Sequence, residues 1–123
     1  MYKLVILIEP QVDILAFEKV WPEFLRRAEK MPGLIRESTS HFDRLLHGRY
    51  HISMMHELFF ESLEAANAAI ASPEGQEAGK VLQIITAGKV TLLFAEHQED
   101  ELKNIQQHQN QEKEDSQDAD GET

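Results

Sequence analysis

The stretch Leu4-Val5-Ile6-Leu7-Ile8 decides the fold of this chain. Five consecutive apolar residues are typical of a strand buried on both faces, because successive side chains of a strand point to opposite sides. A second stretch, Val90-Thr91-Leu92-Leu93-Phe94-Ala95, is also apolar on both faces. Only two helical stretches are available to cover a sheet, so one sheet face would stay open in a monomer. We therefore expect a homodimer that forms through the sheet face.

Composition and charge exclude several classes of protein. The 123 residues fit one domain, and the absence of cysteine excludes disulfides, thiolate nucleophiles and cysteine-ligated zinc. No stretch approaches the roughly 20 apolar residues of a membrane helix, and the first apolar run lacks the pattern of a secretory signal. We expect a cytoplasmic protein with no membrane contact. The net charge of −10 and the lack of a basic patch also predict no nucleic-acid partner.

The acidic residues are concentrated at the C-terminal end. From Gln98 onward the chain consists mainly of Gln, Glu, Asp and Asn. Such a segment cannot offset an ordering entropy of roughly 1–2 kcal/mol per residue. We predict a folded domain over residues 1–98 and a disordered acidic tail over 99–123. The tail would either aid solubility or dock onto a basic protein partner.

Caps and turns predict the order of the elements. Asp13 can cap a helix that continues to Met31, with Pro22 causing a kink or a restart. Strands are expected over residues 34–46 and 49–60, joined by a tight turn at His47-Gly48. Ser62 and Ser72 can cap two further helical pieces, which end near Ile84, and the last strand follows to about Glu96. The order βαββαβ predicts an α+β, ferredoxin-like fold with a four-stranded antiparallel sheet and the helices on one face. Two such sheets would make a dimeric α/β barrel.

Three short stretches carry a resemblance to a known family. Glu57 to Ala65, Ala71 to Gln76 and Lys30 to Leu34 resemble the EthD-like family of dimeric α/β-barrel proteins. The resemblance covers about residues 1–97. It implies a homodimer with a cavity between sheet and helices or within the barrel. Related barrels include cofactor-free monooxygenases, isomerases and cyclases of aromatic or polyketide-like molecules.

The predicted third strand has two different faces. Its mostly apolar positions, expected in the core under the helices, are Tyr50, Ile52, Met54, Leu58 and Phe60. Its mixed positions, expected to face a ligand cavity, are His51, Ser53, Met55, Glu57 and Phe59. A partly desolvated Glu57 would act as a general base, and His51 would position or exchange a proton. Alternatively, Glu57 pairs with Arg36 or Arg44 across the hairpin and is structural.

The remaining candidates depend on the hairpin register. A two-residue turn places His41 with Met54 and His56, whereas a three-residue turn places it with His51 and Glu57, as a third catalytic candidate. We expect His56 to be a structural histidine of the core. The side chains of Phe42, Met54, Met55 and Phe59 either form a wall for an aromatic ligand or fill the core. Ligand spacings typical of a metal site are missing, so no metal is predicted.

The sequence leaves two functions open. The first is an EthD-like protein that binds a small, largely apolar or aromatic molecule and acts through proton transfer as a cofactor-independent oxygenase, isomerase or cyclase. The second is a non-enzymatic ligand carrier or an accessory subunit whose acidic tail docks onto another protein. No strained nucleophile turn or glycine-rich phosphate loop is present, so neither a serine hydrolase nor a dinucleotide cofactor is expected.

Overall fold

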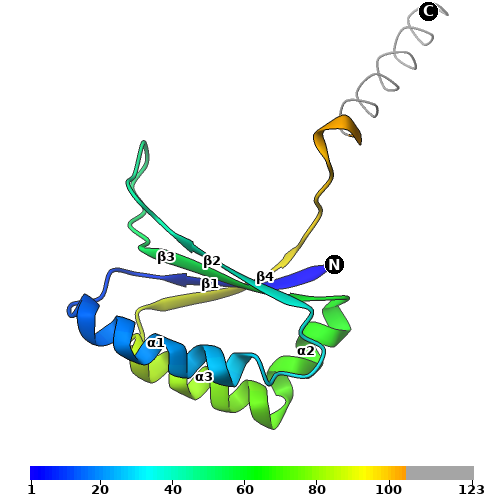
Figure 1. Ribbon diagram of the computed structural model, residues 1–123, viewed down its shortest axis with the longest axis horizontal. Helices are drawn as coiled ribbons and strands as arrows, with labels where there is room; N and C mark the ends of the chain where they lie inside the picture. The colour runs from blue at the N-terminus through cyan, green and yellow to red at the C-terminus, as the bar shows by residue number, and fades with distance from the viewer. Residues whose placement is uncertain (105–123) are drawn as a thin grey trace, which may run out of the picture.

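The computed structural model describes residues 1–104, arranged as one sheet covered on one side by helices (Figure 1). The strands are β1 (Tyr2–Ile8), β2 (Arg36–His41), β3 (Met54–Phe60) and β4 (Val90–Glu96), and the helices are α1 (Ile14–Ala28), α2 (Leu63–Ala71) and α3 (Pro73–Ile85). The sheet order is β2-β3-β1-β4, and every neighbouring pair is antiparallel. The predicted ferredoxin-like α+β fold is therefore confirmed. Most of the acidic tail, residues 105–123, lies outside the described residues, and its disorder stays a prediction.

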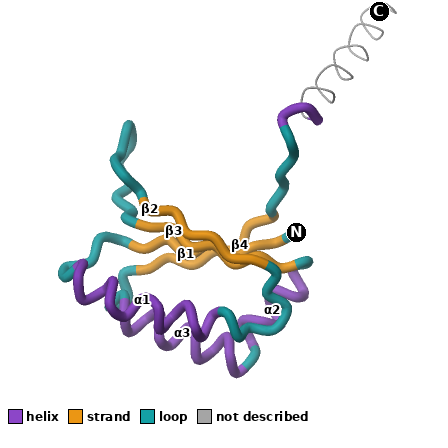
Figure 2. Tube along the Cα trace, viewed as in Figure 1, coloured by secondary structure: helices purple, strands orange, loops and turns teal. Residues whose placement is uncertain are grey.

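The central strand β1 sets the two faces of the sheet. Ile6 pairs with His56 on one side and with Leu92 on the other, so these three side chains share a face. That face is covered by the helices and holds the core, where Ile6 and Ile8 are 1% and 0% exposed. We call the opposite side, which no helix covers, the open face (Figure 2).

Local signals place the helices where the sequence predicts them. The Asp13 carboxylate accepts a hydrogen bond of 3.0 Å from the Ala16 amide and begins α1. The hydroxyls of Ser62 and Ser72 accept bonds of 3.1 and 3.0 Å from the third amide beyond each and begin α2 and α3. Pro22 lies inside α1, which is continuous, so of the two predicted alternatives, a kink or a restart, the restart is wrong. None of the helices in residues 1–104 is both long and apolar enough to cross a bilayer.

The predicted hairpin is wrong in length. The strands over 34–46 and 49–60 shrink to β2 and β3, and residues 42–53 form a loop between them. Its glycine, Gly48, has the positive φ of 114° that the turn prediction required. The ladder ends where β1 ends, because Ile8 is paired with Met54 and no third strand supports the two beyond that point.

Two segments leave the sheet on its open side. The 42–53 loop rises at one end, and residues 97–104 rise at the other (Figure 1). The second segment is fixed to the sheet by the His97 amide, which donates a bond of 2.8 Å to the Met1 carbonyl. The open face therefore lies between two projecting segments.

Candidate functional site

An apolar cavity of about 210 Å³ lies between the sheet and the helices. Its lining residues are Leu4, Ile6, Phe24, Met31, Leu58, Ile70, Gly75, Ala78, Gly79, Leu82, Leu92, Leu93 and Phe94. All are apolar residues or glycines. The cavity can therefore hold an uncharged molecule, but its lining side chains can neither donate nor accept a proton.

The cavity walls come from three parts of the fold. Leu4 and Leu58 supply the sheet side, and Phe24 of α1 and Leu82 of α3 supply the helix side. These four side chains are between 1% and 8% exposed. The wall is thus part of the main core and keeps its shape without a ligand.

A polar cluster lies beside this core. His56 is 1% exposed, and its ring meets the edge of Trp21 at a centroid distance of 5.4 Å. Its Nδ1 is 2.7 Å from the Thr39 hydroxyl, and its Nε2 is 3.1 Å from a Glu37 carboxylate oxygen. With the ring proton on Nε2, His56 donates a hydrogen bond to the Glu37 carboxylate, and the Thr39 hydroxyl donates one to Nδ1.

Burial lowers the pKa of His56 to about 4, although nearby Glu57 and Glu29 act in the opposite direction. The imidazole is therefore neutral near pH 7. Glu29 lies at the end of α1, where a hydrogen bond and charge repulsion from Glu37 raise the pKa of its carboxyl. With both ring nitrogens bonded, His56 is placed as the satisfied core histidine that the sequence predicts.

Glu57 lies on the other side of the sheet, on the open face, and is 8% exposed. It forms an ion pair with Lys3 and accepts a hydrogen bond of 3.3 Å from the Ser38 hydroxyl. The predicted pairing with Arg36 or Arg44 is wrong, because Lys3 is the ion-pair partner of Glu57, Arg36 pairs with Glu99, and Arg44 lies in the 42–53 loop.

Arg36 has a different role on the same face. It lies opposite Phe59, with its guanidinium carbon 4.2 Å from the ring centroid, and its Nη2 is 3.1 Å from a Glu99 carboxylate oxygen. His97 meets the edge of the same ring at 4.9 Å. Phe59 is consequently only 2% exposed and is covered by residues of β2 and of the segment after β4.

The structure separates the residues that the sequence grouped as a site. Met55, Glu57 and Phe59 do share the open face. His41 is paired with Met54 and so belongs to the helix-covered face. This is the face that a two-residue turn predicted for His41, although the connection is the longer 42–53 loop. His51 and Phe42 lie in the 42–53 loop rather than on a strand, and both are exposed.

A cavity between sheet and helices was one of the two places that the resemblance implied, but none of the predicted site residues lines it. Its lining residues follow the ordinary spacing of a core, and that pattern does not distinguish a filled core from a hollow one. The available signal was a pair of glycines, Gly75 and Gly79, one helical turn apart within α3.

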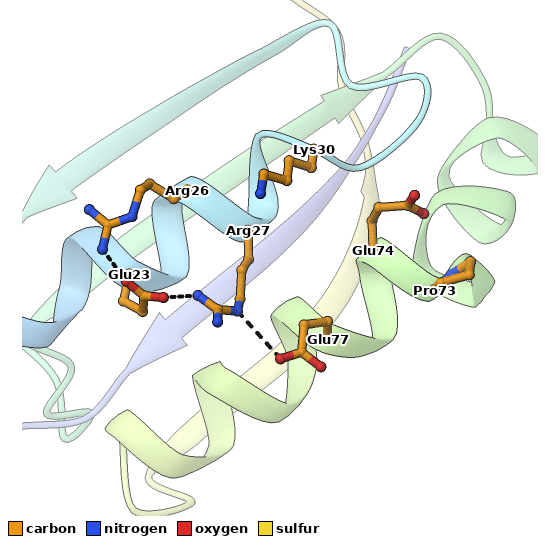
Figure 3. A pocket seen from close by; sticks show the side chains of 7 residues that line it. All are labelled: Glu23, Arg26, Arg27, Lys30, Pro73, Glu74 and Glu77. Carbon is orange, nitrogen blue, oxygen red and sulfur yellow. Dashed lines mark hydrogen bonds and ion pairs between the residues drawn. The ribbon is translucent and has the colours of Figure 1, made fainter.

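A second hollow, of about 480 Å³, lies on the outer surface between α1 and α3 (Figure 3). Four of its six charged side chains pair with each other, since Glu23 binds both Arg26 and Arg27, and Arg27 Nε is 3.4 Å from a Glu77 oxygen. In residues 1–104 no three metal-ligating side chains come together. The apolar cavity is therefore the better candidate site.

Fold and cavity together define a ferredoxin-like α+β protein with a small apolar chamber between its layers. The chain matches no protein-family model. It is 28% identical over 99 residues to an uncharacterized 11.0 kDa protein of Rhodococcus erythropolis, a match that covers 80% of this chain and 96% of that protein.

Solved structures show the same fold. An ethyl tert-butyl ether D (EthD) family protein from Bacillus halodurans is similar with a TM-score of 0.74 and 24% identity, over 80% of this chain and 99% of that one. A dimeric ferredoxin-like protein of unknown function from Jannaschia has a TM-score of 0.59 and 16% identity, over 78% and 98%. SnoaB, a cofactor-independent oxygenase from Streptomyces nogalater, has a TM-score of 0.57 and 15% identity, over 80% and 94%. The resemblance to EthD-like proteins is thus confirmed at the level of the fold.

Proposed function

We propose that this protein is a homodimer that binds a small, largely apolar molecule in the cavity between its sheet and its helices. The cavity of about 210 Å³, lined only by apolar residues and glycines, is the observation that carries the proposal. An engineered apolar cavity of about 150 Å³ in another protein stays dry and binds benzene, so this one has room for a single aromatic ring with small substituents.

The chemistry of the lining selects against charged molecules. A carboxylate or ammonium group in this cavity would lose its hydration and find no hydrogen-bond partner among the lining side chains. The ligand is therefore neutral, and its affinity comes from buried apolar area, at roughly 25 cal/mol per Å².

The homodimer is supported by the open face. Leu7 and Met55 are direct partners there, and neither is fully buried in the protomer. A second copy would cover both, and it would fit between the 42–53 loop and residues 97–104. The Jannaschia protein, which has the same fold and is dimeric, supports a dimer.

Catalysis by proton transfer is a second candidate, at a different place. Glu57 and its partners Lys3 and Ser38 lie on the open face, where a partner protomer would enclose them. SnoaB, a cofactor-independent oxygenase of the same fold, supports such chemistry in principle. In this second candidate function Glu57 serves as the general base. His51 can approach Glu57 only if the 42–53 loop folds toward the open face. A docking role for the acidic tail stays a prediction, as does a cytoplasmic location.

Ligand binding is tested by thermal shift with neutral and charged rings of equal size. Toluene and ethylbenzene should raise the Tm in a concentration-dependent way, because a ligand that binds only the folded state stabilises it by mass action. Benzoate and benzylamine should not raise it. Equal shifts with neutral and charged rings, or no shift with any ring, would contradict the proposal.

A further inference from the structure

We infer that the ligand enters this cavity between α3 and the edge strand β4, and that Gly79 keeps the entrance open for a slim, uncharged aromatic molecule. The inference rests on the proposed function. It assigns to Gly79 a role in ligand access and size selection.

The side chains that line the cavity differ in their solvent exposure. The lining side chains from β1, β3 and α1 are buried, as shown by Ile6 at 1%, Leu58 at 1% and Phe24 at 2%. In contrast, the lining residues Leu92 and Phe94 of β4 are 46% and 40% exposed. The cavity therefore opens along β4.

Strand β4 lies at an edge of the sheet and contributes to the helix-covered face. Leu92 is paired with Ile6 and Phe94 with Leu4, so both side chains are on the helix-covered face. On that face the residues of the inner strands β1 and β3 are mostly buried, whereas β4, like β2, is an edge strand. The helices thus leave the outer margin of this face uncovered, and the cavity reaches solvent there.

The two glycines of α3 that line the cavity differ in the space around them. A Cβ at Gly75 would overlap the carbonyl oxygens of Ala69 and Ile70, so Gly75 is needed for the packing of α3 against α2. A Cβ at Gly79 would meet no atom within 4 Å. Packing does not require glycine at position 79, yet its missing side chain leaves open space at the cavity.

A large side chain at position 79 would occupy this space. Gly79 lies in the middle of α3 and lines the cavity together with Leu92 and Phe94 of β4. A leucine there would extend toward Leu92 and Phe94 and narrow the opening while the inner wall stays unchanged. Access, rather than the affinity of the inner wall, is therefore what this position controls.

The test measures binding of fluorobenzene and of the bulkier single ring 4-fluorocumene by ¹⁹F NMR to the full chain and three variants. Gly79→Leu should slow association of fluorobenzene at least tenfold and remove binding of 4-fluorocumene. Phe94→Ala, on the opposite side of the opening, should speed association of both. Lys80→Leu adds the same side chain at the next, exposed position of α3 and should behave as the parent.

The outcomes separate the two proposals. If the parent binds neither probe, the proposed function fails and the inference fails with it. If the parent binds, and Gly79→Leu and Phe94→Ala both keep its association rates, the entrance is elsewhere and only the inference is overturned. Because Phe94→Ala is expected to change the rate in the opposite direction, the inference stays testable if Gly79→Leu does not fold.

Discussion

Lys3 of β1 and Glu57 of β3 form an ion pair on the open face although they are not direct partners in the ladder. Lys3 is opposite Phe59, and Glu57 is opposite Val5, so the pair is a diagonal one. Their side chains are 19% and 10% exposed. This sheltered ion pair connects the two inner strands, β1 and β3. Removal of either partner would leave the other charge largely buried and without its partner.

Replacing Glu57 with glutamine should therefore lower the free energy of unfolding by about 1–3 kcal/mol, since Lys3 would keep its charge without a partner. Urea denaturation at fixed protein concentration measures the loss. The matched control is the double variant Lys3→Met with Glu57→Leu, which removes both charges and should recover most of the stability. A single variant as stable as the parent would show that the pair contributes nothing.

The buried imidazole of His56 should make stability depend on pH. Its pKa is lowered to about 4 in the folded protein by burial, against an ordinary value of 6.5. As the pH falls from 6.5 to 4, the unfolded chain binds a proton at this residue and the folded protein does not, so the stability decreases. The loss reaches roughly 3 kcal/mol at the lower end.

The measurement is the free energy of unfolding at several pH values, in the parent and in His56→Gln. The variant lacks the titrating group, so its stability should fall less steeply between pH 6.5 and 4, whatever its value at neutral pH. Parallel curves for the two proteins would mean that His56 is not the source of the pH dependence.

Much of the fold could be predicted because its signals are local. The caps Asp13, Ser62 and Ser72 act within one helical turn, and the apolar run of β1 marks a central strand wherever its neighbours lie. The hairpin was predicted too long because residues 42–53 alternate plausibly as strands. Whether they pair depends on where β1 ends, a non-local fact.

The candidate site was harder to predict for the same reason. Lys3 and Glu57 are 54 residues apart, and their pairing depends on the β1–β3 register. The cavity depends on how closely α3 approaches the sheet, which composition does not encode. The sequence shows two glycines inside this helix, Gly75 and Gly79, but only the structure shows that packing does not require the second one.

The open face should form the dimer contact. Leu7 lies on the inner strand β1 of this face, paired with Met55 on one side and with Thr91 on the other, so Leu7→Lys would place a charge in the interface. We expect this variant to sediment as a monomer where the parent sediments as a dimer, because a stable interface buries about 800 Å² per partner and tolerates few unpaired charges. Leu15→Lys, at a position of α1 that is 72% exposed, should leave the dimer intact. A parent that is a monomer at micromolar concentration contradicts the homodimer.

The two glycines of α3 should respond oppositely to alanine. Gly75→Ala would force the helix away from the Ala69 and Ile70 carbonyls, and we expect a loss of about 1–3 kcal/mol in the free energy of unfolding. Gly79→Ala meets no neighbour and restricts the unfolded chain, so it should gain about 0.4–1 kcal/mol. Urea denaturation of both variants beside the parent, at one protein concentration, gives the two signs directly. Destabilisation by Gly79→Ala would show that the space beside this residue is filled, and the entrance to the cavity would then have to lie elsewhere.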